Sequence, residues 1–173
     1  LLLCSSAPTS APPSAPPRPP ERLRCEHAES PLIGLDLEAP RFSWTVPTRG
    51  DGAYGEMQAS HQLQVFEELS AKIAWDSGQV VSSALSTVFG GPPLADDTSF
   101  SWRVRYWPAH AADGAAAPSD WSDAFRFRTA PSSTVWANAS WIDGSRGALR
   151  KQIALPPGSR IVEAFVFASS IGF

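Results

Sequence analysis

The chain has 173 residues, of which 43% are hydrophobic and 18% charged, and its formal net charge is −3. This length suits one domain of ordinary size with additional segments, and the hydrophobic content is sufficient for a packed core. The small negative charge and the lack of a basic block argue against nucleic acid as a partner. No stretch approaches the ~20 apolar residues of a membrane-spanning helix.

Residues 1–20 are predicted to form a tail without a core of its own. Positions 7–20 are almost entirely Ala, Pro, Ser and Thr, a composition that cannot bury apolar surface and that favours an extended or disordered chain. The chain opens on three leucines without a Met, which is compatible with the end of a secretory signal peptide. We therefore expect a secreted or extracellular protein.

From residue 21 the composition changes to short alternating segments separated by turn residues. In the segment from Ser99 to Trp107, Phe, Trp, Val and Tyr alternate with Ser and Arg, so one face is expected to be buried and the other exposed. Seven such segments are predicted as strands, at 22–27, 41–46, 58–67, 72–76, 85–89, 99–107 and 124–129. This number and rhythm are typical of an immunoglobulin-like or fibronectin-III-like antiparallel β-sandwich, which we assign to residues 21–130.

The alternation also predicts which side chains form the core of this all-β domain. The inward-facing positions of the predicted strands are Trp44, Leu63, Val65, Phe100, Trp102, Val104, Phe125 and Phe127. Of the two cysteines, Cys4 lies in the tail, and Cys25 is interpreted as a small buried apolar residue. No Cys-x-x-Cys pair is present, so neither a disulfide scaffold nor a zinc site is expected.

Residues 131–173 are predicted to be the truncated start of a second β domain. Strands are expected at 148–155 and 161–168, with a Pro-Pro-Gly turn between them. Two or three strands do not form a stable sheet in isolation. Asn138 begins an Asn-Ala-Ser sequon and is a candidate glycosylation site in a eukaryotic secretory pathway.

The residues do not predict a catalytic centre, a cofactor or a metal. Asp96 and Asp97 are adjacent, so in an extended chain their carboxylates point to opposite sides, and a turn role is favoured over an acid/base pair. Asp76 precedes a Ser-Gly turn and suits turn capping. The three histidines are widely separated and lack the spacing of metal ligands.

Two family resemblances add to these predictions. The segment from Arg41 to Pro47 resembles the second strand of fibronectin type III domains, and Leu94 followed by Phe100 and Trp102 resembles their penultimate strand, with Phe100 where the family usually has Tyr. Trp-Ser receptor modules of this kind stack the Trp on arginines. We accordingly predict that Trp121 forms a cation–π stack with an arginine of the two neighbouring strands, namely Arg103, Arg105 or Arg126.

The second resemblance is to the N-terminal module of bacterial-type α-L-rhamnosidases. It is carried by six segments in order, at 23–26, 31–36, 40–44, 75–80, 102–104 and 121–122, followed by Trp136, Trp141 and Leu149 to Lys151 at the start of the next domain. Ile33 is inserted relative to the commoner Pro-Leu-Gly of the first loop. In that family, inverting hydrolysis removes terminal α-L-rhamnose, and the catalytic carboxylates belong to a helical barrel far downstream.

The resemblance implies that this chain is a non-catalytic N-terminal accessory region of an α-L-rhamnosidase-like glycoside hydrolase. Its implied partners are the downstream domains of the same polypeptide, with carbohydrate as a second candidate. No catalytic residue is carried over, because no segment of the barrel is present. The alternative is a fibronectin-III-type adhesion or receptor module of a cell surface.

Overall fold

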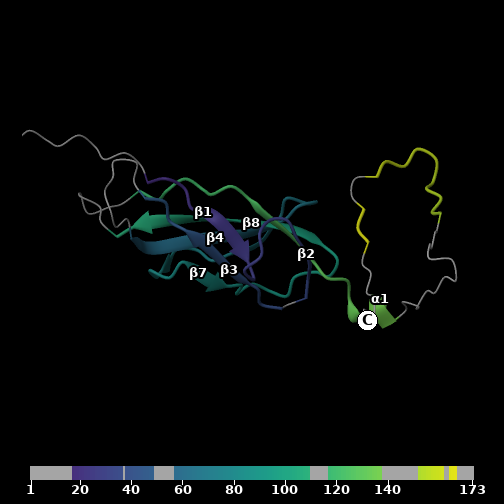
Figure 1. The fold of residues 1–173 in the computed structure, drawn as a ribbon, viewed down its shortest axis with the longest axis horizontal. Helices are drawn as coiled ribbons and strands as arrows, with labels where there is room; N and C mark the ends of the chain where they lie inside the picture. Colours follow the sequence, from purple (N-terminus) through teal and green to yellow (C-terminus); the bar gives the residue numbers. More distant parts are fainter. Residues whose placement is uncertain are drawn as a thin grey trace, which may run out of the picture.

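The computed structural model describes residues 17–36, 38–48, 57–109, 117–137, 152–161 and 164–166. Within these ranges the chain folds as two packed β-sheets with a short helix, α1 (Ser133–Ala137), at one end (Figure 1). The strands in chain order are β1 (Glu21–Cys25), β2 (Leu32–Leu35), β3 (Arg41–Thr45), β4 (Gln58–Glu67), β5 (Ile73–Asp76), β6 (Val80–Val81), β7 (Ser86–Val88), β8 (Ser99–Pro108) and β9 (Phe125–Thr129).

The smaller sheet has the strand order β1-β3-β7, and the larger sheet has the order β2-β9-β8-β4-β5, with β6 also paired to β4. The antiparallel pair of β4 and β8 forms the centre of the larger sheet, and each of the two strands is 10 residues long. Its register places Leu63 opposite Val104 and Val65 opposite Trp102. The residues that alternate with these therefore share the outer face of the sheet.

The seven predicted strands are all present in the described residues, and the all-β sandwich is confirmed. Two further strands, β2 and β6, were not predicted, and β2 runs parallel to β9, so the larger sheet is mixed rather than wholly antiparallel. The pairing of β2 skips a position between Ile33 and Leu35, where Gly34 has a φ of +83°. Because this bulge spaces Leu32 and Leu35 by three, a search for period-two alternation does not detect the strand.

The core lies between the two sheets and is built from aromatic rings. All eight predicted core residues are at most 3% exposed. Trp102 is at the centre, with its ring 4.8 Å from Phe42 and 5.9 Å from Phe125 between centroids. Phe100 stacks on Phe127 at 5.5 Å, so the position that usually holds Tyr contributes a ring contact here.

Cys25, the last residue of β1, belongs to this core and is completely buried. Burial, with a smaller contribution from the negative charge of Glu26, raises the pKa of the Cys25 thiol to about 12. The thiol is therefore neutral at physiological pH and acts as a small apolar side chain.

The C-terminal part of the chain contributes one helix and no strand within the described residues. Helix α1 was not predicted, and the described residues within the expected strands at 148–155 and 161–168 form no β-ladder. Residues 152–161 are exposed, so no second sheet is available there to satisfy strand edges. The second domain over 131–173 stays a prediction, and Asn138 and residues 1–16 lie outside the described ranges. No helix in the described part of the chain has the length and hydrophobicity that crossing a bilayer requires.

Gln58, at the start of β4, forms a polar junction between the two sheets. The Trp44 indole of the smaller sheet donates to Gln58 Oε1 at 3.0 Å, and Gln58 Nε2 donates to the carbonyl oxygens of Ser82 and Ala84 at 2.9 and 2.8 Å. Gln58 is only 3% exposed, although simple alternation would place it outside with Gln62. A bulge between Gln58 and Ser60 reverses its direction.

His61 lies beside this junction, and its protonation is expected to make the domain sensitive to acid. It is 2% exposed, and burial lowers its pKa below 6.5 despite an opposing hydrogen bond to the Ser82 backbone. The unfolded chain therefore binds a proton below pH ~6.5 that the folded chain resists, so the free energy of unfolding should fall as the pH drops through that range.

Urea unfolding at pH 7.5, 6.5, 5.5 and 5.0 measures this effect, which is at most about 1.4 kcal/mol per pH unit for one proton. His61→Gln, which cannot titrate, is the control and should show a flatter profile over the same range. Identical profiles for the two proteins would show that His61 carries no acid sensitivity.

Candidate functional site

Two arginines of β8 are fixed on the outer face of the larger sheet by two glutamines of β4. Arg105 donates from Nε and Nη2 to Gln62 Oε1 at 3.0 and 2.7 Å. Arg103 donates in the same way to Gln64 Oε1 at 3.2 and 2.9 Å. The two pairs are direct neighbours in the β4–β8 register, so each planar guanidinium meets its acceptor across one rung of the sheet.

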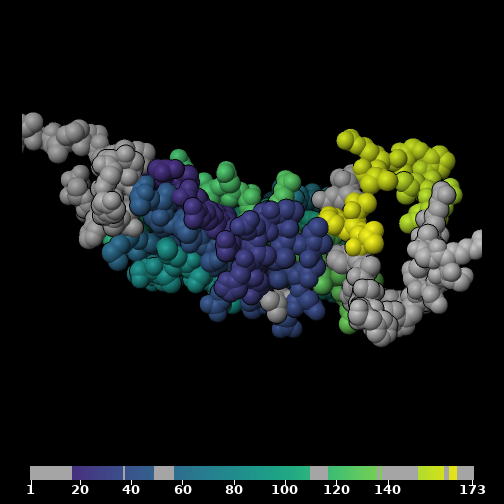
Figure 2. Space-filling model, in the orientation of Figure 1, coloured from purple at the N-terminus to yellow at the C-terminus, as the bar shows by residue number. Residues whose placement is uncertain are grey.

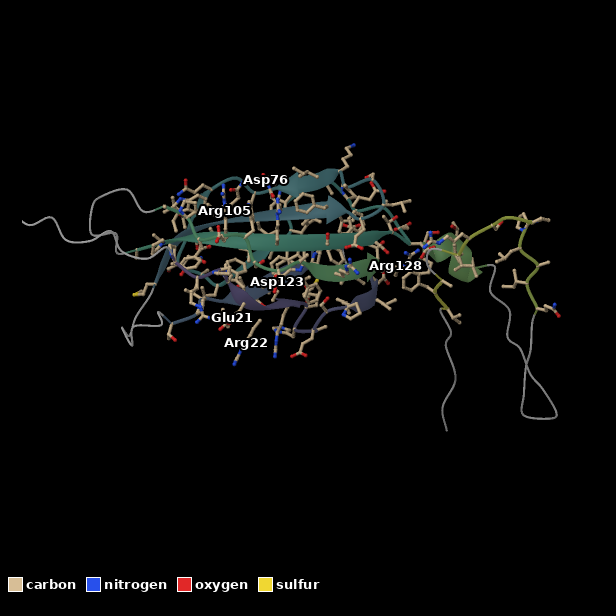
Figure 3. The ribbon with its side chains drawn as sticks, turned by 90° about the horizontal axis from the view of Figure 1, so that it is seen from above. Glu21, Arg22, Asp76, Arg105, Asp123 and Arg128 are labelled. Carbon is tan, nitrogen blue, oxygen red and sulfur yellow. The ribbon has the colours of Figure 1, made fainter. Side chains whose placement is uncertain are left out.

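Asp76, the last residue of β5, extends this hydrogen-bonded row. Its Oδ1 and Oδ2 accept from the Nε2 groups of Gln62 and Gln64 at 2.8 and 2.7 Å, and Oδ1 also accepts from the Gly78 amide at 2.8 Å, which caps the turn as predicted. Partial burial raises the pKa of Asp76, but these three hydrogen bonds and the charge of Arg105 outweigh it and lower the pKa below 3.8. Asp76 and Arg105 lie on the same part of the sheet in Figure 3.

Trp121 lies under both guanidinium groups. The Cζ atoms of Arg103 and Arg105 are 4.5 and 4.6 Å from the centroid of its ring. Arg103 also lies 4.8 Å from Phe66, and Arg105 lies 5.1 Å from Trp107. We call this row the arginine–tryptophan ladder, comprising Asp76, Gln62, Gln64, Arg103, Arg105, Trp121, Phe66 and Trp107.

The backbone around Trp121 explains how its ring reaches this position. Strand β9 pairs with β8 only as far as Trp102, and residues 119–122 then pair with the rest of β8. The Ser119 and Ser122 amides donate to the Tyr106 and Val104 carbonyls at 2.8 and 2.9 Å, and the two serine hydroxyls accept from the amides of the same partners at 3.2 and 3.1 Å. With both serines turned towards β8, Trp121 between them is directed onto the outer face.

Arg126, the fourth residue of the predicted stack, takes a different partner. Its Nε lies 3.1 Å from Glu68 Oε1. The register accounts for this, because Arg126 is opposite Ser101, whereas Trp121 lies alongside the half of β8 that extends beyond β9. The sequence placed these arginines on one face correctly but could not show which end of that face each occupies.

Sequence reasoning also missed the rest of the ladder. The alternation of β4 places Gln62 and Gln64 opposite to the buried Leu63 and Val65, and Asp76 was predicted as a turn cap, but no sequence pattern joined these three residues to the arginines. The available signal was the matching alternation of Gln in β4 and Arg in β8, which becomes informative only when the register of the two strands is known.

The arrangement offers binding and positioning groups rather than acid/base chemistry. Asp97 is engaged with Arg128, whose Nη2 lies 2.9 Å from its Oδ1, and Asp76 is held by three donors. Inverting glycoside hydrolysis requires two carboxyl groups about 6.5–9.5 Å apart across the sugar, one of them with a raised pKa, whereas the pKa of Asp76 is lowered. Within the described residues no group of three His, Cys, Asp or Glu could hold a metal ion.

Replacing Trp121 tests how much the ladder contributes to stability. Trp121→Ala removes two cation–π contacts, each worth about 0.5–2 kcal/mol, and should lower the free energy of unfolding by about 1–4 kcal/mol. Trp107→Ala is the matched control, because Trp107 contacts one guanidinium only and should cost about half as much. Urea unfolding measures the loss of stability in both variants. Equal losses would show that the second guanidinium contact of Trp121 contributes no stability.

Together, the two facing sheets and the aromatic core between them define an immunoglobulin-like β-sandwich domain. Residues 20–133 match a family model described as the Rha78A-like, N-terminal immunoglobulin domain. The chain belongs to this family.

Relatives of known identity agree with this assignment. The chain is 36% identical over 121 residues to an α-L-rhamnosidase of Streptomyces avermitilis, a match that covers 68% of this chain and 11% of that protein. A crystal structure of the S. avermitilis enzyme complexed with L-rhamnose superposes with a TM-score of 0.55 and 31% identity, covering 65% of this chain and 10% of the other.

A second α-L-rhamnosidase structure, from Dictyoglumus thermophilum, gives a TM-score of 0.58 at 25% identity and covers 69% of this chain and 13% of that one. The chain thus corresponds to a small part of the length of each relative.

Proposed function

We propose that this chain is the N-terminal accessory domain of an α-L-rhamnosidase-type glycoside hydrolase and that its role is to support the domains that come after it. The observation that carries the proposal is the family match over residues 20–133, which belongs to the N-terminal immunoglobulin domain. The catalytic residues of the whole protein are then supplied by another part of the polypeptide.

The chemistry of the described residues favours a supporting role. Two of the carboxylates are held by neighbouring groups: Asp76 accepts hydrogen bonds within the ladder, and Asp97 is paired with Arg128. The ring of Trp121, which would be the natural platform for a sugar, is already covered by two guanidinium groups. These contacts stiffen the longest strand pair of the domain.

An activity assay tests this proposal. The purified chain should release no p-nitrophenol above background from p-nitrophenyl α-L-rhamnoside, whereas the polypeptide encoded by the complete gene should release it. Turnover by the isolated chain would contradict the assignment of catalysis to another region. A complete gene product that lacks rhamnosidase activity would contradict the proposed enzyme class.

Two finer expectations belong to the same proposal. A secreted location, predicted from the opening leucines, is tested by comparing culture medium with cell extract. Binding of carbohydrate by the chain itself is tested by titrating L-rhamnose into it under calorimetry. A heat change that saturates would add a binding role to the supporting one.

A further inference from the structure

A groove with a volume of about 210 Å³ lies at one end of the larger sheet, where the C-terminal part of the chain returns to the sandwich. It is lined by residues in and just before β2, by residues of β8 and β9, by the residue that follows β4 and by the C-terminal segment, namely Pro31, Leu32, Ile33, Glu68, Ser99, Phe100, Arg126, Phe127, Arg128 and Phe165. In Figure 2 yellow residues of the C-terminal part stand against this end of the sandwich.

Arg128 is fixed in this groove before it meets Phe165. Its Nε and Nη2 donate to Asp97 Oδ1 and to the Asp97 carbonyl at 3.0 and 2.6 Å, and its Nη1 donates to Ser99 Oγ at 2.8 Å. Its side chain is only 15% exposed. The guanidinium is therefore held as a flat platform at the groove wall, close to the C-terminal segment in Figure 3.

The ring of Phe165 lies over this platform. The Arg128 Cζ atom is 4.2 Å from the ring centroid, the shortest cation–π contact in the described residues. Phe165 is 37% exposed, whereas the adjacent Val166 is 91% exposed. One side chain of the segment thus faces the groove and its neighbour faces solvent, which is the pattern of an anchored segment.

Ile33 gives the groove an apolar rim that the sandwich itself does not cover. It is 50% exposed on β2, the edge strand of the larger sheet. An edge strand presents unpaired backbone groups on one side, so another segment can pack beside it. The rim and the cationic platform together suit an aromatic side chain, which presents an apolar ring edge and an electron-rich face.

We propose that Phe165 docks on Arg128 as one wall of this groove and is the anchor that fixes residues 164–166 against the β2–β9 edge. This inference rests on the proposed accessory function and extends it. The docked Phe165 would set the direction in which the polypeptide leaves the immunoglobulin domain. The contact itself involves no catalytic group.

Hydrogen exchange of the full 173-residue chain tests the docking directly. Phe165→Ala should speed exchange of the amides in β2 and β9 about two- to fivefold, corresponding to one cation–π contact of about 0.5–1 kcal/mol, and should leave the β4–β8 pair unchanged. Val166→Ala is the matched control, because that side chain faces solvent, and it should leave both regions unchanged. Equal exchange in the two variants, or faster exchange spread over all strands in Phe165→Ala, would overturn the proposal.

A double-mutant cycle separates the Phe165 contact from the other bonds of Arg128. In an Arg128→Met background, Phe165→Ala should have less than half of its effect on β2 exchange, because the platform is already lost. An undiminished effect would overturn the role of Arg128. Neither exchange result depends on rhamnoside hydrolysis, so failure of the docking and failure of the proposed enzyme class are distinguished.

Discussion

Trp102→Ala should remove a large share of the stability of the domain, lowering the free energy of unfolding by about 3–5 kcal/mol. Trp102 is completely buried, and its ring contacts Phe42 and Phe125 from the two facing sheets. Its truncation leaves a cavity that neither sheet can close alone. Because a domain of this size has a total stability of about 5–15 kcal/mol, the variant should unfold at much lower urea concentration.

Trp102→Phe is the control for this prediction. The Trp102 Nε1 atom is buried without a hydrogen-bond partner in the described residues, so the phenyl ring sacrifices no hydrogen bond. We expect a cost of about 1–2 kcal/mol from the smaller volume alone. Urea denaturation followed by circular dichroism compares the variants, and a loss below about 1 kcal/mol for Trp102→Ala would contradict a central place for this ring.

Gln58→Leu should destabilise the domain by at least about 3 kcal/mol, because it leaves four partners without their hydrogen bonds. These are the Trp44 indole, the carbonyl groups of Ser82 and Ala84, and Nδ1 of the His61 ring, which all belong to the junction between the sheets. A buried polar group that loses its partner costs about 1–3 kcal/mol, whereas the leucine gains only the burial of an apolar side chain.

Gln62→Leu makes the same change four residues further along β4, on the outer face. Its hydrogen bonds to Asp76 and Arg105 are exposed or half-buried, so water can replace them, and the cost should be about 1 kcal/mol or less. Thermal unfolding of both variants measures the difference. If Gln62→Leu lowered the stability as much as Gln58→Leu, burial of the Gln58 hydrogen bonds would not increase their contribution to stability.

The residues that were predictable from sequence are those whose role depends on local alternation. Trp44, Leu63 and Trp102 face inward because their strands alternate with period two, and the pattern needs no knowledge of the partner strand. Gln58 and Leu35 escaped because a bulge breaks the alternation next to each of them. Bulges arise from the geometry of the paired strand, which a single sequence does not display.

The candidate site was predictable only in part, for a related reason. Arg103 and Arg105 could be placed beside Trp121 because the segment that carries Trp121 follows β8 in the chain and pairs with it. Asp76 joins the ladder because β5 lies next to β4 in the sheet, and Phe165 reaches Arg128 from a segment distant in sequence. Contacts of this kind depend on register and on tertiary packing, and they appear only once the strands are aligned.

Because β2 pairs with β9, it cannot form its place in the sheet until β9 has been synthesised. Ser30, just before β2, binds the amide of Arg126 in β9, and the two are 96 positions apart. At a translation rate of about 5–20 residues per second, the early strand waits on the order of 5–20 seconds for its neighbour to leave the ribosome. During that interval Leu32, Ile33 and Leu35 of the nascent polypeptide have no neighbouring strand to pair with.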